Sequence, residues 1–243
     1  MSEDNLKDQF QNLPEELRKQ FEEDAKENLQ HVQDTFLRIT TMGMRYQVNN
    51  CDIGNRGLEF KAIILRELPV NLWYKDRFDP GAPVRPNCWS LEGLKPDPTS
   101  QLIQSESCLT CRWNRFGSGI GADGKRRGKA CRNTRRLVLK SEDFDLPLVL
   151  SLPPTSKKVF NNYLKSLSSG TVSIPLFIVC TIFSFDLNVN YPRPVMKTDG
   201  VIFPLMYEEL KILRMSPQIE DILKAFGTRE EYGEGGEDDE IPF

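Results

Sequence analysis

The chain has a single histidine among its 243 residues, His31, and it lies in a charged stretch with the pattern of a surface helix. Ser-His-Asp and Cys-His active sites need a histidine base, and many catalytic zinc sites take histidine ligands. Phosphate-cradling Gly-x-x-x-x-Gly-Lys-Ser/Thr is also absent, and residues 117–121 lack the strand–helix context of a dinucleotide fold. No spacing of carboxylates singles out a metal-nuclease site. We therefore expect a binding protein and not an enzyme.

Long hydrophobic runs are absent as well. The longest, residues 174–185, is interrupted by Pro175, Thr181 and Ser184 and is too short to cross a bilayer. The N-terminus is acidic and lacks the apolar core of a signal peptide. We expect a cytoplasmic address, where thiols stay reduced and clustered cysteines more often bind metal than form disulfides.

The net charge of −3 conceals a strong segregation of charge. Residues 1–36 carry ten acids and four bases, and residues 228–243 carry seven acids and one base, so each end has a charge of −6. Residues 37–227 must then carry +9. A basic centre between acidic ends is typical of a polyanion binder with screening or partner-seeking tails. For the N-terminal end, solubility alone is an equally good explanation.

Three regions follow from the pattern along the chain. Residues 1–37 form an acidic segment whose apolar stripe over 13–37 predicts an amphipathic helix that docks on the main domain or on a partner. Residues 38–227 form the main domain, with a cysteine-bearing insertion at about 86–136. The glycine- and glutamate-rich residues 228–243 predict a disordered tail. Residues 80–98, rich in proline, are expected to hold little regular structure.

Short strands dominate the main domain, so the fold class is mainly β with added α. A helix opens after Pro153-Pro154, with Val159, Phe160, Tyr163, Leu164 and Leu167 at helical spacing. This order predicts a five-stranded barrel of the oligonucleotide-binding (OB) type, with its helix between the third and fourth strands. The expected strands are 44–48, 58–68, 137–139, 146–152, 172–185 and 201–207, and the last helical segments are 208–213 and 218–226.

Four of the six cysteines lie in the insertion, as Cys88, Cys108, Cys111 and Cys131. They are separated by nineteen, two and nineteen residues. The Cys108-x-x-Cys111 knuckle places two sulfurs within reach of one ion, and two further thiolates complete a tetrahedral shell that suits zinc and leaves no open position. We expect one structural zinc ion. An iron–sulfur cluster or a redox pair is the alternative.

A dense basic run overlaps the cysteines. Residues 112–136 carry nine Lys or Arg against one acid, a local charge of +8, with two aromatic residues among them. Cations neutralise phosphates and aromatic faces stack on unpaired bases, which favours single-stranded nucleic acid. In the alternative, the aromatics form a small core of the zinc module or barrel and the cations are merely solvated. The candidate nucleic-acid-binding residues are Trp73, Tyr74, Arg112, Trp113, Arg115, Phe116, Lys125, Arg126, Arg127, Lys129, Arg132, Arg135 and Arg136.

The chain ends in a cluster of acids followed by Ile-Pro-Phe and a free carboxylate. This tip resembles that of bacterial single-stranded-DNA-binding proteins, which also end in acids and Ile-Pro-Phe. As a whole the chain looks more like a phage-encoded protein of that class, with an OB barrel, a cysteine-bearing insertion and the same tail. The resemblance implies that the tip recruits replication and repair proteins and competes with DNA for the basic groove. The partner-binding residues that it implies are Asp238, Asp239, Glu240, Ile241, Pro242 and Phe243.

These observations favour a sequence-independent single-stranded-DNA-binding protein of replication, recombination or repair, and the resemblance implies a viral source and the host cytoplasm. A zinc-ribbon transcription or RNA-binding factor is the main alternative. A nuclease, or an inhibitor that mimics DNA with its acidic segments, is a third.

Overall fold

The computed structural model describes residues 14–15, 17–19, 36–75, 85–121, 124–168, 173–202 and 206–224. The chain divides into two units, Met1–Thr35 and Phe36–Phe243. In the first unit, residues 15 and 17–19 are helical. Most of the helix predicted over 13–37 lies outside the described residues.

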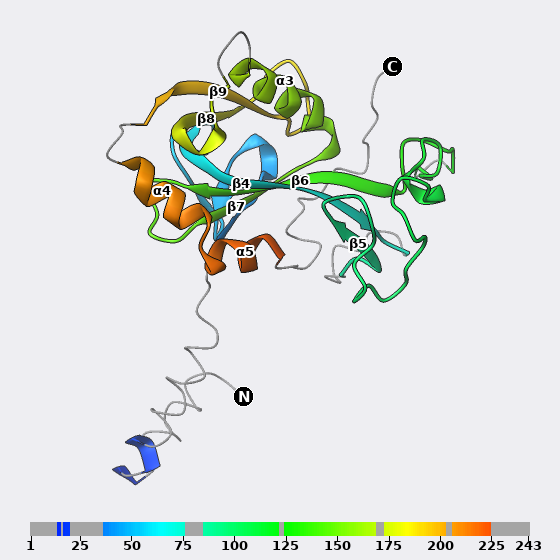
Figure 1. Ribbon diagram of the computed structural model, residues 1–243, viewed down its shortest axis with the longest axis horizontal. Coiled ribbons are helices and arrows are strands. Elements are labelled where there is room, and N and C mark those ends of the chain that lie inside the picture. Colours follow the sequence, from blue (N-terminus) through cyan, green and yellow to red (C-terminus); the bar gives the residue numbers. More distant parts are fainter. Residues whose placement is uncertain are drawn as a thin grey trace. The chain divides into compact units, whose positions relative to one another are not determined.

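The second unit is mainly β, with some helices, and its main sheet is curled into a half-barrel (Figure 1). Its central strand, β4 (Phe60–Trp73), pairs antiparallel with β6, β8 and β5. The strand order is β1-β7-β6-β4-β8-β9, with β5 beside β4 and with β1 and β7 parallel. The other strands of this sheet are β1 (Leu37–Ile39), β5 (Cys88–Leu91), β6 (Cys131–Lys140), β7 (Leu148–Leu152), β8 (Val179–Phe185) and β9 (Pro194–Val201).

The sheet is covered on both faces, which explains why its central strands read as continuous apolar runs. On one face Ile64 and Leu139 pack in a core with α3 (Lys157–Leu167). On the other, Ile63 and Val138 pack in a core with α4 (Tyr207–Arg214) and α5 (Pro217–Lys224). The remaining elements are η1 (Met42–Met44), β2 (Gln47–Val48), β3 (Cys51–Asp52), η2 (Arg112–Asn114), η3 (Pro154–Ser156) and η4 (Leu176–Ile178).

Helix α3 forms where the sequence predicts it. Proline occupies the first position of η3, where its missing N–H costs nothing, and η3 leads directly into the helix. Phe160, Tyr163 and Leu167 recur at spacings of three and four, so they share one face and are buried together. Burying a side chain such as Phe160 contributes roughly 1.5–3 kcal/mol.

Several expected elements differ from the structure. Among the described residues β7 and β9 do not pair, and β7 instead pairs with β1, so the five-stranded barrel is observed only as a half-barrel sheet. The strand expected over 201–207 is wrong, because β9 ends at Val201 and Tyr207 begins α4. Strand β8 begins at Val179 and not at 172, since Pro175 leads into η4. Helices at 208–213 and 218–226 are confirmed by α4 and α5, apart from their ends.

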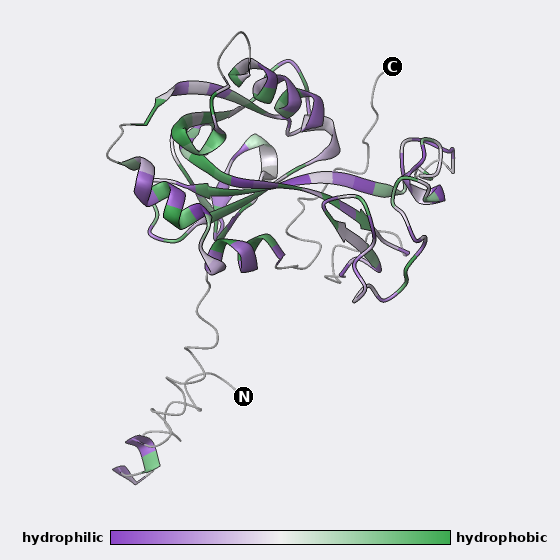
Figure 2. Ribbon diagram, viewed as in Figure 1, coloured by the Kyte–Doolittle hydropathy of each residue, from purple (hydrophilic) through white to green (hydrophobic). Residues whose placement is uncertain are grey.

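Beyond the two cores, β4 and β6 continue side by side and β5 joins the free edge of β4 (Figure 1). We call this part the arm, meaning residues 69–73 of β4, 131–136 of β6 and β5. The chain between β4 and β6, residues 74–130, is called the insertion, and it includes β5. The arm was not predicted, because β6 was expected only over 137–139 and β5 lies in the proline-rich stretch. The outer half of β6 is hydrophilic, unlike its inner half (Figure 2).

Candidate nucleic-acid interface

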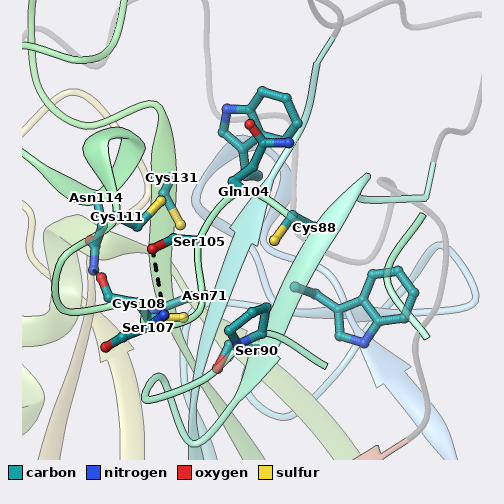
Figure 3. A pocket seen from close by; sticks show the side chains of 13 residues that line it. Asn71, Cys88, Ser90, Gln104, Ser105, Ser107, Cys108, Cys111, Asn114 and Cys131 are labelled. Carbon is teal, nitrogen blue, oxygen red and sulfur yellow. Dashed lines mark hydrogen bonds between the residues drawn. The ribbon is translucent and has the colours of Figure 1, made fainter. Parts of the chain in front are cut away.

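The arm and the insertion together bring Cys88, Cys108, Cys111 and Cys131 to one cavity. Trp73 of β4 pairs with Cys88 of β5 on one side and with Cys131 of β6 on the other. Residues that are directly paired across strands point to the same face of a sheet. The loop that carries Cys108 and Cys111 is held by a hydrogen bond from the Cys108 N–H to the Leu94 carbonyl, 2.9 Å. All four thiols line the same cavity (Figure 3).

Burial raises the pKa of two of these thiols, Cys88 and Cys131. Burial, and then the nearby sulfurs of Cys108 and Cys111, raise the pKa of Cys131 to about 12. The pKa of Cys88 is also raised, first by burial. Among the described residues, no group of three or more His, Cys, Asp or Glu side chains is arranged to hold a metal ion. The predicted zinc site therefore stays a prediction: its donors share a cavity without forming a coordination shell.

Two of the predicted aromatic residues attach the insertion to the arm. The rings of Trp73 and Trp113 stack with centroids 5.5 Å apart and planes 27° apart. The Trp113 indole N–H donates to the Gln104 side-chain oxygen at 2.8 Å, and the Arg112 guanidinium lies 4.6 Å from the indole centroid. Trp73 is buried, and Tyr74 beside it is half-buried. For Trp73 and Trp113 the structure favours packing over base stacking.

A third aromatic residue, Phe116, is 76% exposed. It follows η2 in a loop closed by a hydrogen bond from the Gly117 N–H to the Gly128 carbonyl, 2.6 Å. The Lys129 ammonium lies 6.0 Å from the centroid of its ring. Exposed cations share the same loops. We call this group the insertion surface, and its members are Arg112, Arg115, Phe116, Lys125, Arg126 and Arg127.

The cations nearer the sheet are less accessible. Lys129, Arg132 and Arg135 are half-buried. The Lys129 ammonium donates to the side-chain oxygens of Asn114, 3.1 Å, and Asn133, 3.0 Å. The Arg135 guanidinium pairs with Glu67.

The structure corrects the placement of Arg136. Its side chain is 2% exposed and donates to the carbonyl of Leu223 in α5, 2.9 Å away. The reason is strand geometry, because Arg136 and Val138 lie two positions apart in β6 and so face the same side of the sheet. That side is covered by α5, so Arg136 is not available to nucleic acid.

Sequence reasoning missed the polar residues of the arm and one lysine of α3. The Asn133 side-chain N–H donates to the Asn71 side-chain oxygen at 2.6 Å, and the Asn71 side-chain N–H donates to the Gly93 carbonyl at 3.2 Å. Lys157, the first residue of α3, is exposed. Asn71 and Asn133 pair directly across β4 and β6. A sequence prediction that extended these two strands into the arm would have brought them together. No pattern in the sequence indicates Lys157.

The predicted partner-binding residues, 238–243, lie outside the described residues. Within the described part of the chain, no helix has both the length and the apolar character needed to span a bilayer. Comparison with family models, with curated proteins and with solved structures finds no match to this chain.

Proposed function

We propose that this protein binds single-stranded DNA without sequence preference and acts in DNA replication, recombination or repair. The observation that carries the proposal is the insertion surface, where Phe116 and five cations are exposed on the same loops of the insertion. A phenyl ring open to solvent gives an unpaired base a face to stack on, and the cations neutralise the adjoining phosphates. Neither contact depends on which base is present.

The strand order supports the same proposal. Five strands run β7-β6-β4-β8-β9, with α3 between β7 and β8 in the chain. An OB barrel has this order when β4, β6, β7, β8 and β9 are taken as its five strands, although the closing contact is not among the observed pairs. In OB folds, the loop between the first and second strands is one of those that bind oligonucleotides. The insertion occupies that position, between β4 and β6.

The four thiols are proposed to hold one structural zinc ion. Cys88, Cys108, Cys111 and Cys131 supply the soft donor set that zinc prefers, and they already line one cavity. Zinc would fix the loops that present the insertion surface, which are polar and glycine-rich and pack few apolar side chains. With four protein ligands no position is left for a substrate, so the ion would have no catalytic role.

The acidic tip is proposed to recruit replication or recombination proteins. The acids attract a partner whose pocket has a basic rim, and the apolar Ile-Pro-Phe segment fits such a pocket. This role rests on residues 238–243 and on the resemblance described above. A viral source and action in the host cytoplasm belong to the same proposal.

Fluorescence anisotropy with labelled oligo-dT, the matching duplex and oligo-rU, each at two salt concentrations, tests the DNA-binding function. We expect the tightest binding to oligo-dT and a marked loss of affinity at the higher salt, because counterions are released from the neutralised phosphates. Equal affinity for duplex would refute the proposal. Tighter binding to oligo-rU would favour the RNA-binding alternative.

A further inference from the structure

A second group of cations lies where α3 meets the arm. The Arg135 guanidinium of β6 is 5.8 Å from the centroid of the Phe160 ring in α3. Lys157 lies three residues before Phe160, so it shares that side of the helix one turn nearer the N-terminus. Lys129, just before β6, is close enough that its charge and that of Arg135 both act on Lys157. We call Lys129, Arg135 and Lys157 the junction cluster.

The junction cluster has an excess of positive charge. Glu67 pairs with Arg135, and the first turn of α3 has no acidic residue. The Lys157 ammonium makes no hydrogen bond or ion pair with any residue that the structure describes. Partial burial, and then the charges of Arg135 and Lys129, lower the pKa of Lys157. The positive end of the α3 dipole adds to this repulsion. An anion bound between these like charges would reduce their repulsion.

A chain of hydrogen bonds fixes the position of Lys129 in the cluster. It runs from the Gly93 carbonyl through Asn71 and Asn133 to the Lys129 ammonium, and Asn114 accepts a second bond from that ammonium. A lysine ammonium has three N–H donors. Two are used by the two asparagines, and the third has no acceptor among the residues that the structure describes, so a ligand could take it. Lys129 also lies beside the exposed ring of Phe116, so it joins the insertion surface to the junction cluster.

We propose that the junction cluster binds a backbone phosphate of the DNA strand that crosses the insertion surface, with Lys157 as a DNA-binding residue. The inference rests on the proposed function. It extends the DNA path from the insertion, past Lys129, to the start of α3. A base stacked on Phe116 would place its strand beside Lys129, and the next phosphates would reach Arg135 and Lys157.

The test compares Lys157→Gln with Lys158→Gln in the full-length protein, by anisotropy with oligo-dT over a salt series. Both lysines are exposed in the first turn of α3, so the two variants lose the same charge one residue apart. Loss of one phosphate contact makes the negative slope of log K against log salt shallower by about 0.7. If binding at 1 M salt is unchanged, this corresponds to roughly a fivefold loss of affinity at 0.1 M salt. We expect this loss for Lys157→Gln, wild-type binding for Lys158→Gln, and wild-type binding for Lys157→Arg, which keeps the charge.

Thermal unfolding of each variant checks the fold, and Lys157→Gln is expected to melt no lower than wild type because it removes a repelled charge. Wild-type affinity and slope for Lys157→Gln would overturn the inference and leave the proposed function standing. Equal losses for Lys157→Gln and Lys158→Gln would also overturn it, since they would indicate general charge and not a site. If wild-type protein fails to bind oligo-dT, the proposed function itself fails.

Discussion

In the proposed interface, base stacking is assigned to Phe116. It is 76% exposed, whereas Trp73 and Trp113 are used to pack the insertion on the arm. We predict that Phe116→Ala weakens oligo-dT binding by about 1–3 kcal/mol, the usual contribution of one stacked base. Anisotropy titration measures the change.

Leu109→Ala is the matched control, because Leu109 is an equally exposed apolar residue of the insertion, at 75%. It should bind oligo-dT as wild type does. If both variants bind oligo-dT as tightly as wild type, the proposal that bases stack on the insertion surface is wrong.

Arg136 and Arg126 belong to the same basic run but have different roles in the structure. The buried Arg136 bonds a carbonyl of α5, while Arg126 is exposed. Removing a buried charged donor leaves its acceptor unsatisfied, so Arg136→Ala should lower the free energy of unfolding by about 1–3 kcal/mol. Arg126→Ala should leave stability unchanged and weaken oligo-dT binding. Urea unfolding measures the stability of each variant, and anisotropy measures its affinity for oligo-dT. A destabilised Arg126→Ala together with a fully stable Arg136→Ala would contradict the placement of both residues.

At the residue scale the sequence gives the types of side chain in the basic run but not which of them are exposed. The count of cations in 112–136 does not depend on the fold, but their exposure does. Arg136 is buried only because β6 begins at Cys131 and directs alternate residues toward α5. Lys157 is part of the proposed junction cluster only because Phe160 of α3 packs against Arg135. These are long-range contacts, and local sequence patterns do not record them.

At the scale of elements, the apolar segments were predicted best. Helices α3, α4 and α5 and the inner half of β6 have apolar residues at regular spacing, which is the main local signal. The outer half of β6 is polar, so it lacks that signal and becomes a strand by pairing with β4.

Pro69 lies directly after the strand expected over 58–68, and β4 continues through it. Proline removes a ladder donor and argues against a strand interior. In the described structure β8 pairs with β4 only as far as Ile63, and β5 begins to pair only at Val70. One edge of β4 is therefore without a partner at Pro69, and the strand continues through it to Trp73.

The cysteine cavity gives a prediction for the insertion as an element. Protein purified in metal-free buffer should contain one zinc ion per chain by elemental analysis, and Cys108→Ser should lose it, because a shell of four thiolates is broken. Cys51→Ser is the control, since Cys51 is exposed in β3 and lies outside the cavity. Chelation should also weaken oligo-dT binding by loosening the insertion surface. If zinc-free wild-type protein bound oligo-dT with full affinity, the proposed role of zinc in DNA binding would be wrong.

At the scale of the whole molecule, charge is sorted along the chain, with acidic ends around a basic middle. Composition predicted a polyanion binder without any knowledge of the fold, and that function stays a proposal. The fold class, mainly β with helices, was confirmed, and the five-stranded barrel was observed only as a half-barrel sheet. Closure of this barrel would need contacts between β7 and β9, the two end strands of the five, and periodicity within each strand does not specify such contacts.

The acidic tip gives a prediction for the full chain. Deleting residues 237–243 should leave oligo-dT affinity unchanged or raise it, because the lost acids no longer compete with phosphates for the cations. Capture of replication or recombination proteins by the immobilised protein should be lost. Anisotropy and pull-down with purified candidate partners measure the two effects. Weaker DNA binding after the deletion would contradict the role given to the tip.

Photo-crosslinking of oligo-dT to the full-length protein, with mass-spectrometric mapping of the attached peptides, tests the central claim most directly. The claim is that single-stranded DNA lies on the insertion surface and passes the arm. Crosslinks are therefore predicted at Phe116 and within residues 124–135. Crosslinks confined to β8, β9 or α4, or none at all under conditions where oligo-dT binds, would contradict it.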